Sequence, residues 1–219
     1  MLNYKKLDDP KTIFYNKNQK IFVIDGLILK NKINKILESI TKSKNKPSKI
    51  FKHRNKIIKF EFNNFNNLHY DLQDLIKEIN SRKFIKILEK IFNIDKLYPD
   101  KSKLFSGLSI SNKGSRLKEH VDFNYNKKIK KFRYLNLLLY LNKNYKSKNG
   151  GIFFIKNFNL KKKIRIKPTL NKAVIFHTNS KTPHGFTKIN SKERISLNMY
   201  YYTNKNYSLS KQKHRTIWK

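Results

Sequence analysis

The spacing of hydrophobic residues changes near residue 104 of this 219-residue chain. Before that point apolar side chains recur every three or four residues, in 33–40, 72–79 and 84–92, which predicts amphipathic helices. After it, apolar and polar residues alternate in short runs, which is the two-residue period of β-strands. The expected strands are 104–111, 133–141, 152–155, 163–166, 173–176, 185–189 and 195–203. Many short strands without helices between them indicate a sandwich or a barrel in the second half.

The first half is predicted to be mainly helical, with two short strands at 21–24 and 57–62. Ser81 is the expected N-cap of the helix at 84–92, because a serine hydroxyl accepts a hydrogen bond from the first helical turn. The fold class is therefore α+β, and we expect a single domain over 1–219. It comprises a mainly helical support region (1–103), the strand-rich core (104–204) and a basic tail (205–219), which we expect to be irregular.

The composition is typical of a soluble, globular protein. A hydrophobic fraction of 38% and an aromatic fraction of 13% supply a core. Apolar runs such as 135–141 are far shorter than the ~20 residues that a membrane-spanning helix needs. The first ten residues contain no apolar stretch of the kind found in signal peptides. We therefore expect no membrane association and a cytoplasmic location, or the host interior if a virus encodes the chain.

The charge balance is strongly basic. There are 51 Lys and Arg residues against 14 Asp and Glu residues, a net charge of +37. Such a charge attracts nucleic acid and other polyanions. Lys, Asn and Ile are also the residues that AT-rich codons favour, so the charge has a second interpretation in the base composition of the genome. Both interpretations stay open.

Two histidines and one aspartate have the spacing of a metal site. His120 and Asp122 are two residues apart, and on an extended strand such residues point to the same face. His184 follows sixty-two residues after Asp122, where a turn enters a strand. Two imidazoles and one carboxylate make the facial triad that binds non-haem Fe(II) and leaves coordination positions open. The tripeptide alone would suit an ordinary hydrogen-bonded pair, so the prediction rests on the combination.

An anion-binding arginine follows the second histidine. Arg194 stands ten residues after His184, and Ser196 shares its face of the predicted strand. A guanidinium with a neighbouring hydroxyl suits a carboxylate ligand. His177 is the alternative third metal ligand, but Thr187 stands ten residues after it, where an arginine would be needed. We therefore expect His177 to have a structural role or to lie at the edge of the pocket.

The order and spacing of these residues resemble the 2-oxoglutarate and Fe(II)-dependent oxygenases, specifically the prolyl 4-hydroxylase-like branch. The resemblance also uses Tyr140-Leu141-Asn142, Gly150-Gly151-Ile152-Phe153 and the segment 168–176. It implies a double-stranded β-helix, or jelly-roll, core in the C-terminal half, flanked by N-terminal helices. It further implies catalytic iron ligands at His120, Asp122 and His184, and 2-oxoglutarate-binding residues at Arg194, Tyr140 and Ser196. Tyr140 would also suit a plain core position, and Ser196 would also suit a backbone contact.

The activity that the resemblance implies is hydroxylation of a peptidyl residue, proline by analogy, or of a small molecule. The cofactor and cosubstrates would be Fe(II), 2-oxoglutarate and O2, with ascorbate as a further candidate, and the products would include succinate and CO2. Relatives often carry an aromatic hydroxyl about ten residues before the first ligand, whereas Ile110 and Ser111 stand there in this chain. The inner wall of the cosubstrate pocket is therefore not predicted.

Two other functions remain as alternatives. The first is a non-enzymatic, basic nucleic-acid-binding protein on a jelly-roll scaffold, because Tyr and Phe side chains among many lysines can stack on bases. The second is a nucleic-acid demethylase of the AlkB-like branch. That branch typically has a second arginine six residues after the first, and this chain has Tyr200 at that position.

Overall fold

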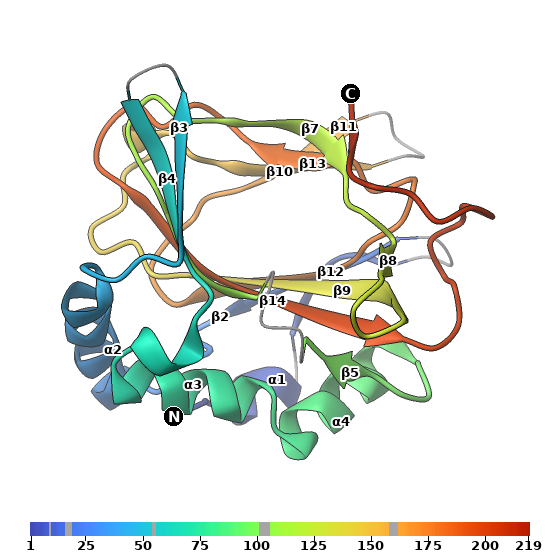
Figure 1. The fold of residues 1–219 in the computed structure, drawn as a ribbon. Coiled ribbons are helices and arrows are strands. Elements are labelled where there is room, and N and C mark those ends of the chain that lie inside the picture. The colour runs from blue at the N-terminus through green and yellow to red at the C-terminus, as the bar shows by residue number, and fades with distance from the viewer. Residues whose placement is uncertain (9, 16–18, 54–55, 101–105, 158–161) are drawn as a thin grey trace.

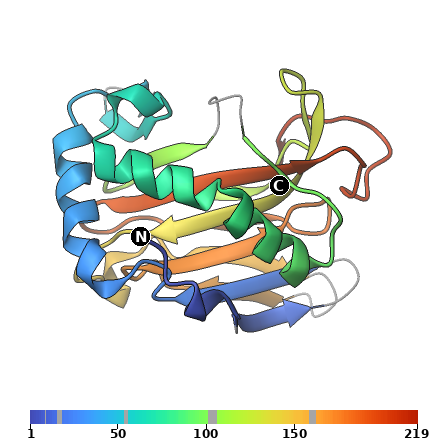
Figure 2. The same cartoon turned by 90° about the horizontal axis from the view of Figure 1, so that it is seen from below.

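Two antiparallel sheets face each other, and helices cover the outer face of the larger one, as the computed structural model shows (Figure 1, Figure 2). The structure describes all residues except 9, 16–18, 54–55, 101–105 and 158–161. The helices are α1 (Lys5–Asp8), α2 (Lys30–Ser43), α3 (Tyr70–Ile79) and α4 (Arg82–Phe92), with 3-10 turns at Phe65–Asn67 and Ser147–Asn149. None of the helices in the described part of the chain is long and apolar enough to span a membrane.

The larger sheet has the order β1-β2-β12-β9-β14-β6-β4-β3, with β5 paired to β14 and β8 paired to β9. Its strands are β1 (Lys11–Tyr15), β2 (Lys20–Asp25), β3 (Lys49–His53), β4 (Lys56–Phe62), β5 (Tyr98–Pro99), β6 (Gly107–Ser111), β8 (Tyr125–Asn126), β9 (Lys131–Tyr140), β12 (Lys172–His177) and β14 (Arg194–Thr203). The smaller sheet has the order β11-β10-β13-β7-β15. Its strands are β7 (Leu117–Val121), β10 (Phe153–Asn157), β11 (Lys162–Ile166), β13 (His184–Phe186) and β15 (Ile217–Trp218).

The core strands alternate between the sheets along the chain. β6, β9, β12 and β14 belong to the larger sheet, and β7, β10 and β13 come between them in the smaller one. This alternation is the pattern of a jelly roll, in which each sheet is built from strands distant in sequence. The structure confirms the predicted jelly-roll core in the second half of the chain.

Two separate cores result from the two-residue period of the strands. On β12, Ala173 and Ile175 pack against the helices. Val174 and Phe176, which alternate with them, pack against the smaller sheet. Successive side chains of a strand point to opposite faces, so a strand buried on both sides is apolar throughout. Polar residues on the inner face of such a strand therefore stand out as candidates for a site between the sheets.

The helical layer agrees with the sequence-based expectation. Helix α4 begins after Ser81, whose hydroxyl accepts a hydrogen bond from the Phe84 N–H at 3.2 Å. It ends at Asn93, which has a left-handed φ of 49°, a common conformation at helix C-termini. The buried stripe of α4, including Leu88 and Phe92, belongs to the core beneath the larger sheet. The helices thus support the sheet from the side opposite the candidate site.

The first 103 residues contribute strands as well as helices. β2 pairs with β12 and β4 pairs with β6, so both edges of the larger sheet come from this region. β1 and β3, which extend these edges, were not predicted, because their runs of Lys with Ile and Phe carry little alternation. Residues 104 and 105 of one predicted strand lie outside the described residues.

Two expectations for the second half need correction. The strand predicted at 185–189 is shorter, because β13 ends at Phe186 and only Ile189 makes an isolated bridge, to Gly150. The tail was expected to be irregular, and this is wrong for its last residues. β15 pairs with β7. The tail before it is held beside this strand by a hydrogen bond that the His214 N–H donates to Asn124 Oδ1.

Candidate metal centre

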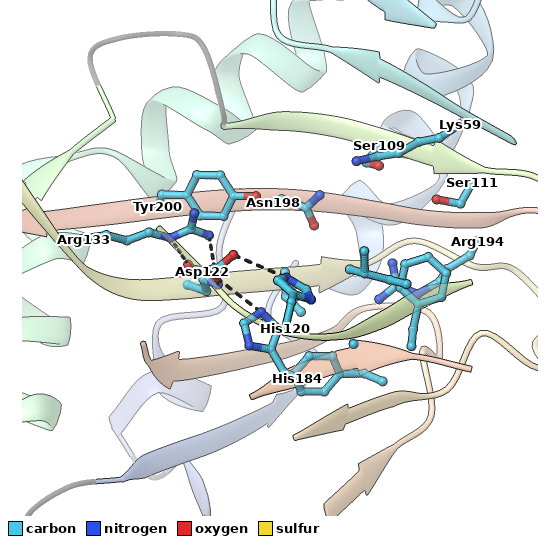
Figure 3. Close-up of a pocket in the computed structure, with 16 residues that line it drawn as sticks. Lys59, Ser109, Ser111, His120, Asp122, Arg133, His184, Arg194, Asn198 and Tyr200 are labelled. Carbon is cyan, nitrogen blue, oxygen red and sulfur yellow. Dashed lines mark hydrogen bonds and ion pairs between the residues drawn. The ribbon is translucent and has the colours of Figure 1, made fainter. Parts of the chain in front are cut away.

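His120 and His184 lie opposite each other in the smaller sheet (Figure 3). The register of β7 and β13 pairs these two residues directly, and their ring centroids are 4.5 Å apart. Asp122 follows β7, with one carboxylate oxygen 3.5 Å from His120 Nε2 and the other 3.3 Å from His184 Nε2. One ligand atom from each residue lies within 4.8 Å of the other two. The structure therefore brings together the three residues that the sequence selected.

Backbone carbonyls orient both imidazoles. His120 Nδ1 lies 2.9 Å from the Lys118 carbonyl oxygen, and His184 Nδ1 lies 2.9 Å from the Thr182 carbonyl oxygen. A carbonyl oxygen only accepts, so Nδ1 of each ring carries the proton and donates it. Each Nε2 then presents its lone pair to Asp122. Three electron-pair donors converge, and only a proton or a cation between them makes this arrangement favourable.

Asp122 is held by two neighbours on β9. Arg133 Nη2 lies 3.0 Å from Asp122 Oδ2, and Asn136 Nδ2 donates a hydrogen bond to the same oxygen at 2.8 Å. Burial acts to raise the pKa of Asp122, but the neighbouring positive charge, above all that of Arg133, outweighs it. The pKa of the carboxyl group is therefore well below its ordinary value, and the group is ionised and fixed in orientation.

The Arg133 guanidinium is enclosed by aromatic rings. Its Cζ lies 3.8 Å from the centroid of the Tyr200 ring and 4.7 Å from that of Phe123. Burial raises the pKa of Tyr200 to about 12, and the charge of Arg133 opposes the rise. Tyr200 is thus a neutral phenol that stacks on the guanidinium. The pair closes one end of the site.

Arg194 is buried without an acidic partner among the described residues. Its Nε donates to the Gly151 carbonyl at 3.1 Å and its Nη1 donates to Ser196 Oγ at 3.3 Å. The rings of Phe186 and Tyr140 lie 4.5 and 4.9 Å from its Cζ. Burial lowers the pKa of the guanidinium, because a buried charge without a counter-ion is unfavourable. An anion such as a carboxylate would stabilise it by charge-assisted hydrogen bonds.

Tyr140 and Ser196 adjoin Arg194, on paired positions of β9 and β14. The Tyr140 hydroxyl has no hydrogen-bond partner in the part of the chain that the structure describes. Burial raises its pKa to about 12, and the charge of Arg194 opposes this rise. Both residues are fully buried, and neither is among the residues that line the pocket. Ser196 therefore orients Arg194, while the Tyr140 hydroxyl is a donor without an acceptor.

One pocket of about 100 Å³ connects the triad to Arg194 (Figure 3). His120, Asp122 and His184 lie on one side of it and Arg194 on the other. Four polar residues complete its wall, namely Lys59, Ser109, Ser111 and Asn198. Ser109 and Ser111 on β6 thus occupy the inner wall for which the sequence made no prediction. Lys59 comes from β4, in the first half of the chain, for which the sequence pointed to no particular site residue.

Sequence reasoning missed Arg133, Asn136, Asn198 and Lys59. A signal existed for the two asparagines, because each lies between two apolar residues of its strand. No comparable signal marked Lys59, one lysine among many. His177, the alternative third ligand, lies outside the triad. Its ring stacks on Tyr134 at 4.4 Å, and Tyr134 belongs to the core under the helices.

The donor set fits a ferrous ion. Two imidazoles and a carboxylate would hold the ion and leave coordination positions for other ligands, and the pocket that reaches Arg194 adjoins these three side chains. A ligand with a chelating end and a distal carboxylate has chemical partners for both ends in this pocket. The Tyr140 hydroxyl, which has no hydrogen-bond partner among the described residues, lies beside the Arg194 guanidinium, which has no acidic partner among them.

Comparison with known families gives a match in the strand-rich part of the chain. Residues 106–202 match the sequence model of the 2OG-Fe(II) oxygenase superfamily. The matched segment contains the triad, Arg194, Tyr140 and Ser196. No curated protein matches the chain.

Solved structures that the chain resembles include several prolyl hydroxylases. A prolyl 4-hydroxylase from Phytophthora capsici has a TM-score of 0.63 and 19% identity, over 86% of this chain and 60% of that one. The viral collagen prolyl hydroxylase of Paramecium Bursaria Chlorella virus-1, solved with 2OG, has a TM-score of 0.53 and 19% identity, over 87% and 98%. A Trichoplax adhaerens prolyl hydroxylase, in complex with a hypoxia inducible factor peptide fragment, has a TM-score of 0.54 and 17% identity, over 88% and 87%. These likenesses show the double-stranded β-helix fold.

Proposed function

We propose that this chain, a member of the 2OG-Fe(II) oxygenase superfamily through residues 106–202, is a prolyl 4-hydroxylase-like dioxygenase. The observation that carries the proposal is a single pocket with three convergent metal-binding atoms on one side and an unpaired, buried arginine on the other. If the triad or the arginine had only a structural role, there would be no reason for both to line the same pocket. The cofactor and cosubstrates of this family are Fe(II), 2-oxoglutarate and O2.

The residues divide into three roles. His120, Asp122 and His184 would hold the iron through Nε2, a carboxylate oxygen and Nε2. Arg194 would bind the distal carboxylate of 2-oxoglutarate, and Tyr140 would donate its hydroxyl hydrogen to the same group. Ser196 would hold the guanidinium in place through its contact with Nη1. Catalytic function in this assignment belongs to the three metal ligands, cosubstrate binding to Arg194 and Tyr140, and the positioning of Arg194 to Ser196.

The reaction would couple two oxidations. When bound, Fe(II) with 2-oxoglutarate supplies the activation of O2, so that 2-oxoglutarate becomes succinate and CO2 while a substrate C–H becomes C–OH. The protein contributes position and charge. Carbonyl contacts at Nδ1 keep both imidazoles in the tautomer that can ligate a metal, and Arg133 with Asn136 keeps Asp122 ionised and aligned.

The substrate class is part of the proposal. One neighbour is named for its complex with a peptide fragment and another as a collagen prolyl hydroxylase. By analogy we propose a peptidyl residue, with proline first, and a small molecule as the second possibility. A fold does not determine its substrate, so this choice rests on analogy with those neighbours.

A succinate-release assay tests the function. Protein loaded with Fe(II) would be supplied with 2-oxoglutarate and O2, with and without ascorbate, against panels of proline-containing peptides, amino acids, sugars and nucleic acids. We expect a slow substrate-independent release of succinate, which the true substrate class stimulates. His120→Ala should abolish both. Wild-type protein that releases no succinate under any condition, although metal-loaded, would rule the function out.

A further inference from the structure

Strand β15 runs antiparallel to β7, the strand that carries His120. Its pairing places Ile217 opposite Val121 and Trp218 opposite His120. The Lys219 N–H donates to the Glu119 carbonyl at 2.9 Å and continues the pairing. The C-terminal end of the described chain lies beside β7 in Figure 1. A strand that the sequence did not predict thus forms the edge of the metal-bearing sheet.

Three aromatic side chains form one row across this sheet. Directly paired residues of antiparallel strands point to the same face, so His184, His120 and Trp218 are neighbours on β13, β7 and β15. The His120 ring lies 4.5 Å from the His184 ring on one side and 5.1 Å from the Trp218 ring on the other, centroid to centroid. The indole therefore bounds the imidazole on the side away from the second histidine.

Asn124 fastens the tail to the segment that follows Asp122. This residue is 3% exposed, and its side-chain amide donates to the Gln212 carbonyl at 2.9 Å and to Ser208 Oγ at 3.0 Å. Its Oδ1 accepts a hydrogen bond from the His214 N–H at 2.8 Å. The tail is therefore attached on both sides of the metal-binding pair, at Asn124 and along β7.

Without β15, strand β7 would be the edge of its sheet. The His120 imidazole is fixed at Nδ1 by the Lys118 carbonyl, and that bond alone permits tilting of the ring plane. The Trp218 ring lies beside the imidazole, at an interplanar angle of 39°, where ring contact can limit this tilt. Trp218 is itself 59% exposed, so the burial of its side chain contributes little to the stability of the fold. The contact with His120 is the main interaction that this side chain makes with the site.

We propose that Trp218 is a positioning residue of the metal centre, which holds the His120 imidazole so that Nε2 meets the ion. The proposal rests on the proposed function only in that the triad must bind a metal. Aromatic contact at a ligand's ring acts as other outer contacts of metal ligands do, by fixing ring orientation. The tail would thereby be a working part of the oxygenase domain, although it lies beyond residue 202, where the family match ends.

The tryptophan itself provides the first measurement, because it is the only one in the chain. Co(II), added without oxygen to metal-free protein, should quench the emission of Trp218, with the same midpoint as Co(II) binding measured by calorimetry. A reference protein carries Trp218→Phe and Tyr70→Trp. Tyr70 begins α3, on the far side of the larger sheet, and is 64% exposed. The emission of the tryptophan introduced by Tyr70→Trp should not be quenched by Co(II).

The second measurement compares three variants. Trp218→Ala should weaken Co(II) binding by about 10-fold, as the loss of an outer contact of a metal ligand typically does, and should change the visible absorption of bound Co(II). Trp218→Phe keeps a ring beside His120 and should restore most of the affinity and the spectrum. Ile217→Ala is the matched control, on the same strand but on its opposite face, and should bind Co(II) as wild type does. Thermal unfolding of the metal-free proteins checks that all three fold.

The outcomes separate the two proposals. If wild type binds Co(II) while Trp218→Ala binds it equally tightly with the same spectrum, the positioning role is wrong and the metal centre stands. If Ile217→Ala loses as much affinity as Trp218→Ala, the effect belongs to the strand and the role of the indole is likewise wrong. If wild-type protein binds neither Co(II) nor Fe(II), the proposed function fails as well.

Discussion

Tyr140 places a buried hydroxyl beside Arg194 with no hydrogen-bond partner among the described residues. An unsatisfied buried polar group costs about 1–3 kcal/mol. Tyr140→Phe should therefore raise the free energy of unfolding of the ligand-free protein. It should also weaken 2-oxoglutarate binding by about 10-fold, because the bound carboxylate would lose one hydrogen bond from the protein. Chemical denaturation and calorimetry measure the two effects.

Tyr201→Phe is the matched control for this exchange. The Tyr201 hydroxyl is buried as well, but it donates to the Ile79 carbonyl at 3.0 Å. Its loss should lower stability by about 1 kcal/mol and leave 2-oxoglutarate binding unchanged. Equal effects of the two substitutions on cosubstrate affinity would contradict the role given to Tyr140.

His177 should make stability depend on pH. Burial lowers its pKa to about 4 in the folded protein, whereas an unfolded histidine has a pKa of about 6.5. Between these values the unfolded chain binds a proton that the folded chain does not, so stability is full above about pH 6.5 and falls as the pH drops toward 4. The loss attributable to this residue reaches about 3 kcal/mol.

Urea unfolding at several pH values measures this dependence. His177→Gln should flatten the curve between about pH 4 and 6.5, because the replacement does not titrate there. His53→Gln, at an exposed histidine of β3, should leave the slope as it is in wild type. An unchanged slope in His177→Gln would show that this side chain is protonated in the folded state too.

At the scale of elements, the close pairing of β7 and β13 is what joins the two histidines. Gly185 makes this possible, because a Cβ at this position would lie 2.4 Å from the Leu117 carbonyl oxygen and 2.9 Å from that of Lys118. Gly185→Ala should push the strands apart, lower stability by about 1–3 kcal/mol and weaken metal binding. Thermal unfolding and Co(II) calorimetry test both effects.

Gly26→Ala is the control that distinguishes strain of the backbone from a change in the distance between β7 and β13. Gly26 has a φ of 86°, but a Cβ there would meet nothing within 4 Å. The substitution should cost about 1 kcal/mol through backbone strain and leave metal affinity unchanged. If Gly185→Ala binds metal as tightly as Gly26→Ala does, the spacing of β7 and β13 does not determine the site.

The elements also show how far sequence reasoning reaches. The helices and most core strands were predictable because their hydrophobic periods are local. The triad and Arg194 were predictable because their spacing follows a known family. β15 was not, because two residues at the end of a basic tail acquire strand geometry only from their partner β7. Lys59 was missed for the same reason: its place in the pocket depends on the pairing of β4 with β6, which are distant in sequence.

At the scale of the whole molecule, the net charge of +37 acts on every part of the surface. Like charges repel in the folded state, and salt screens them over a Debye length of about 10 Å at 0.1 M. The melting temperature should rise by a few degrees between roughly 50 mM and 500 mM sodium chloride. Potassium chloride, as a control for the identity of the cation, should give the same rise. A melting temperature that falls with salt would show that attractive ion pairs dominate.

The architecture assigns separate tasks to its two faces. The core between the helices and the larger sheet carries the apolar stripes of α2, α3 and α4, while the space between the sheets holds the candidate site. Alternation along β14 divides the two: Leu197 and Met199 face the helices, and Asn198 faces the pocket. Substitutions in the helical layer should therefore change the free energy of unfolding more than they change the affinity for ligands.

The central claim is that the triad and Arg194 together form a site for a metal and a 2-oxo dicarboxylate. Calorimetric titration of anaerobic, Fe(II)-loaded protein with 2-oxoglutarate tests it most directly. We expect stoichiometric binding to wild type that requires the metal, no binding to His120→Ala, and binding to Arg194→Leu that is at least about 100-fold weaker while its metal affinity is kept. Metal-loaded wild-type protein that does not bind 2-oxoglutarate, or an Arg194→Leu variant that binds it as tightly as wild type, would contradict the claim.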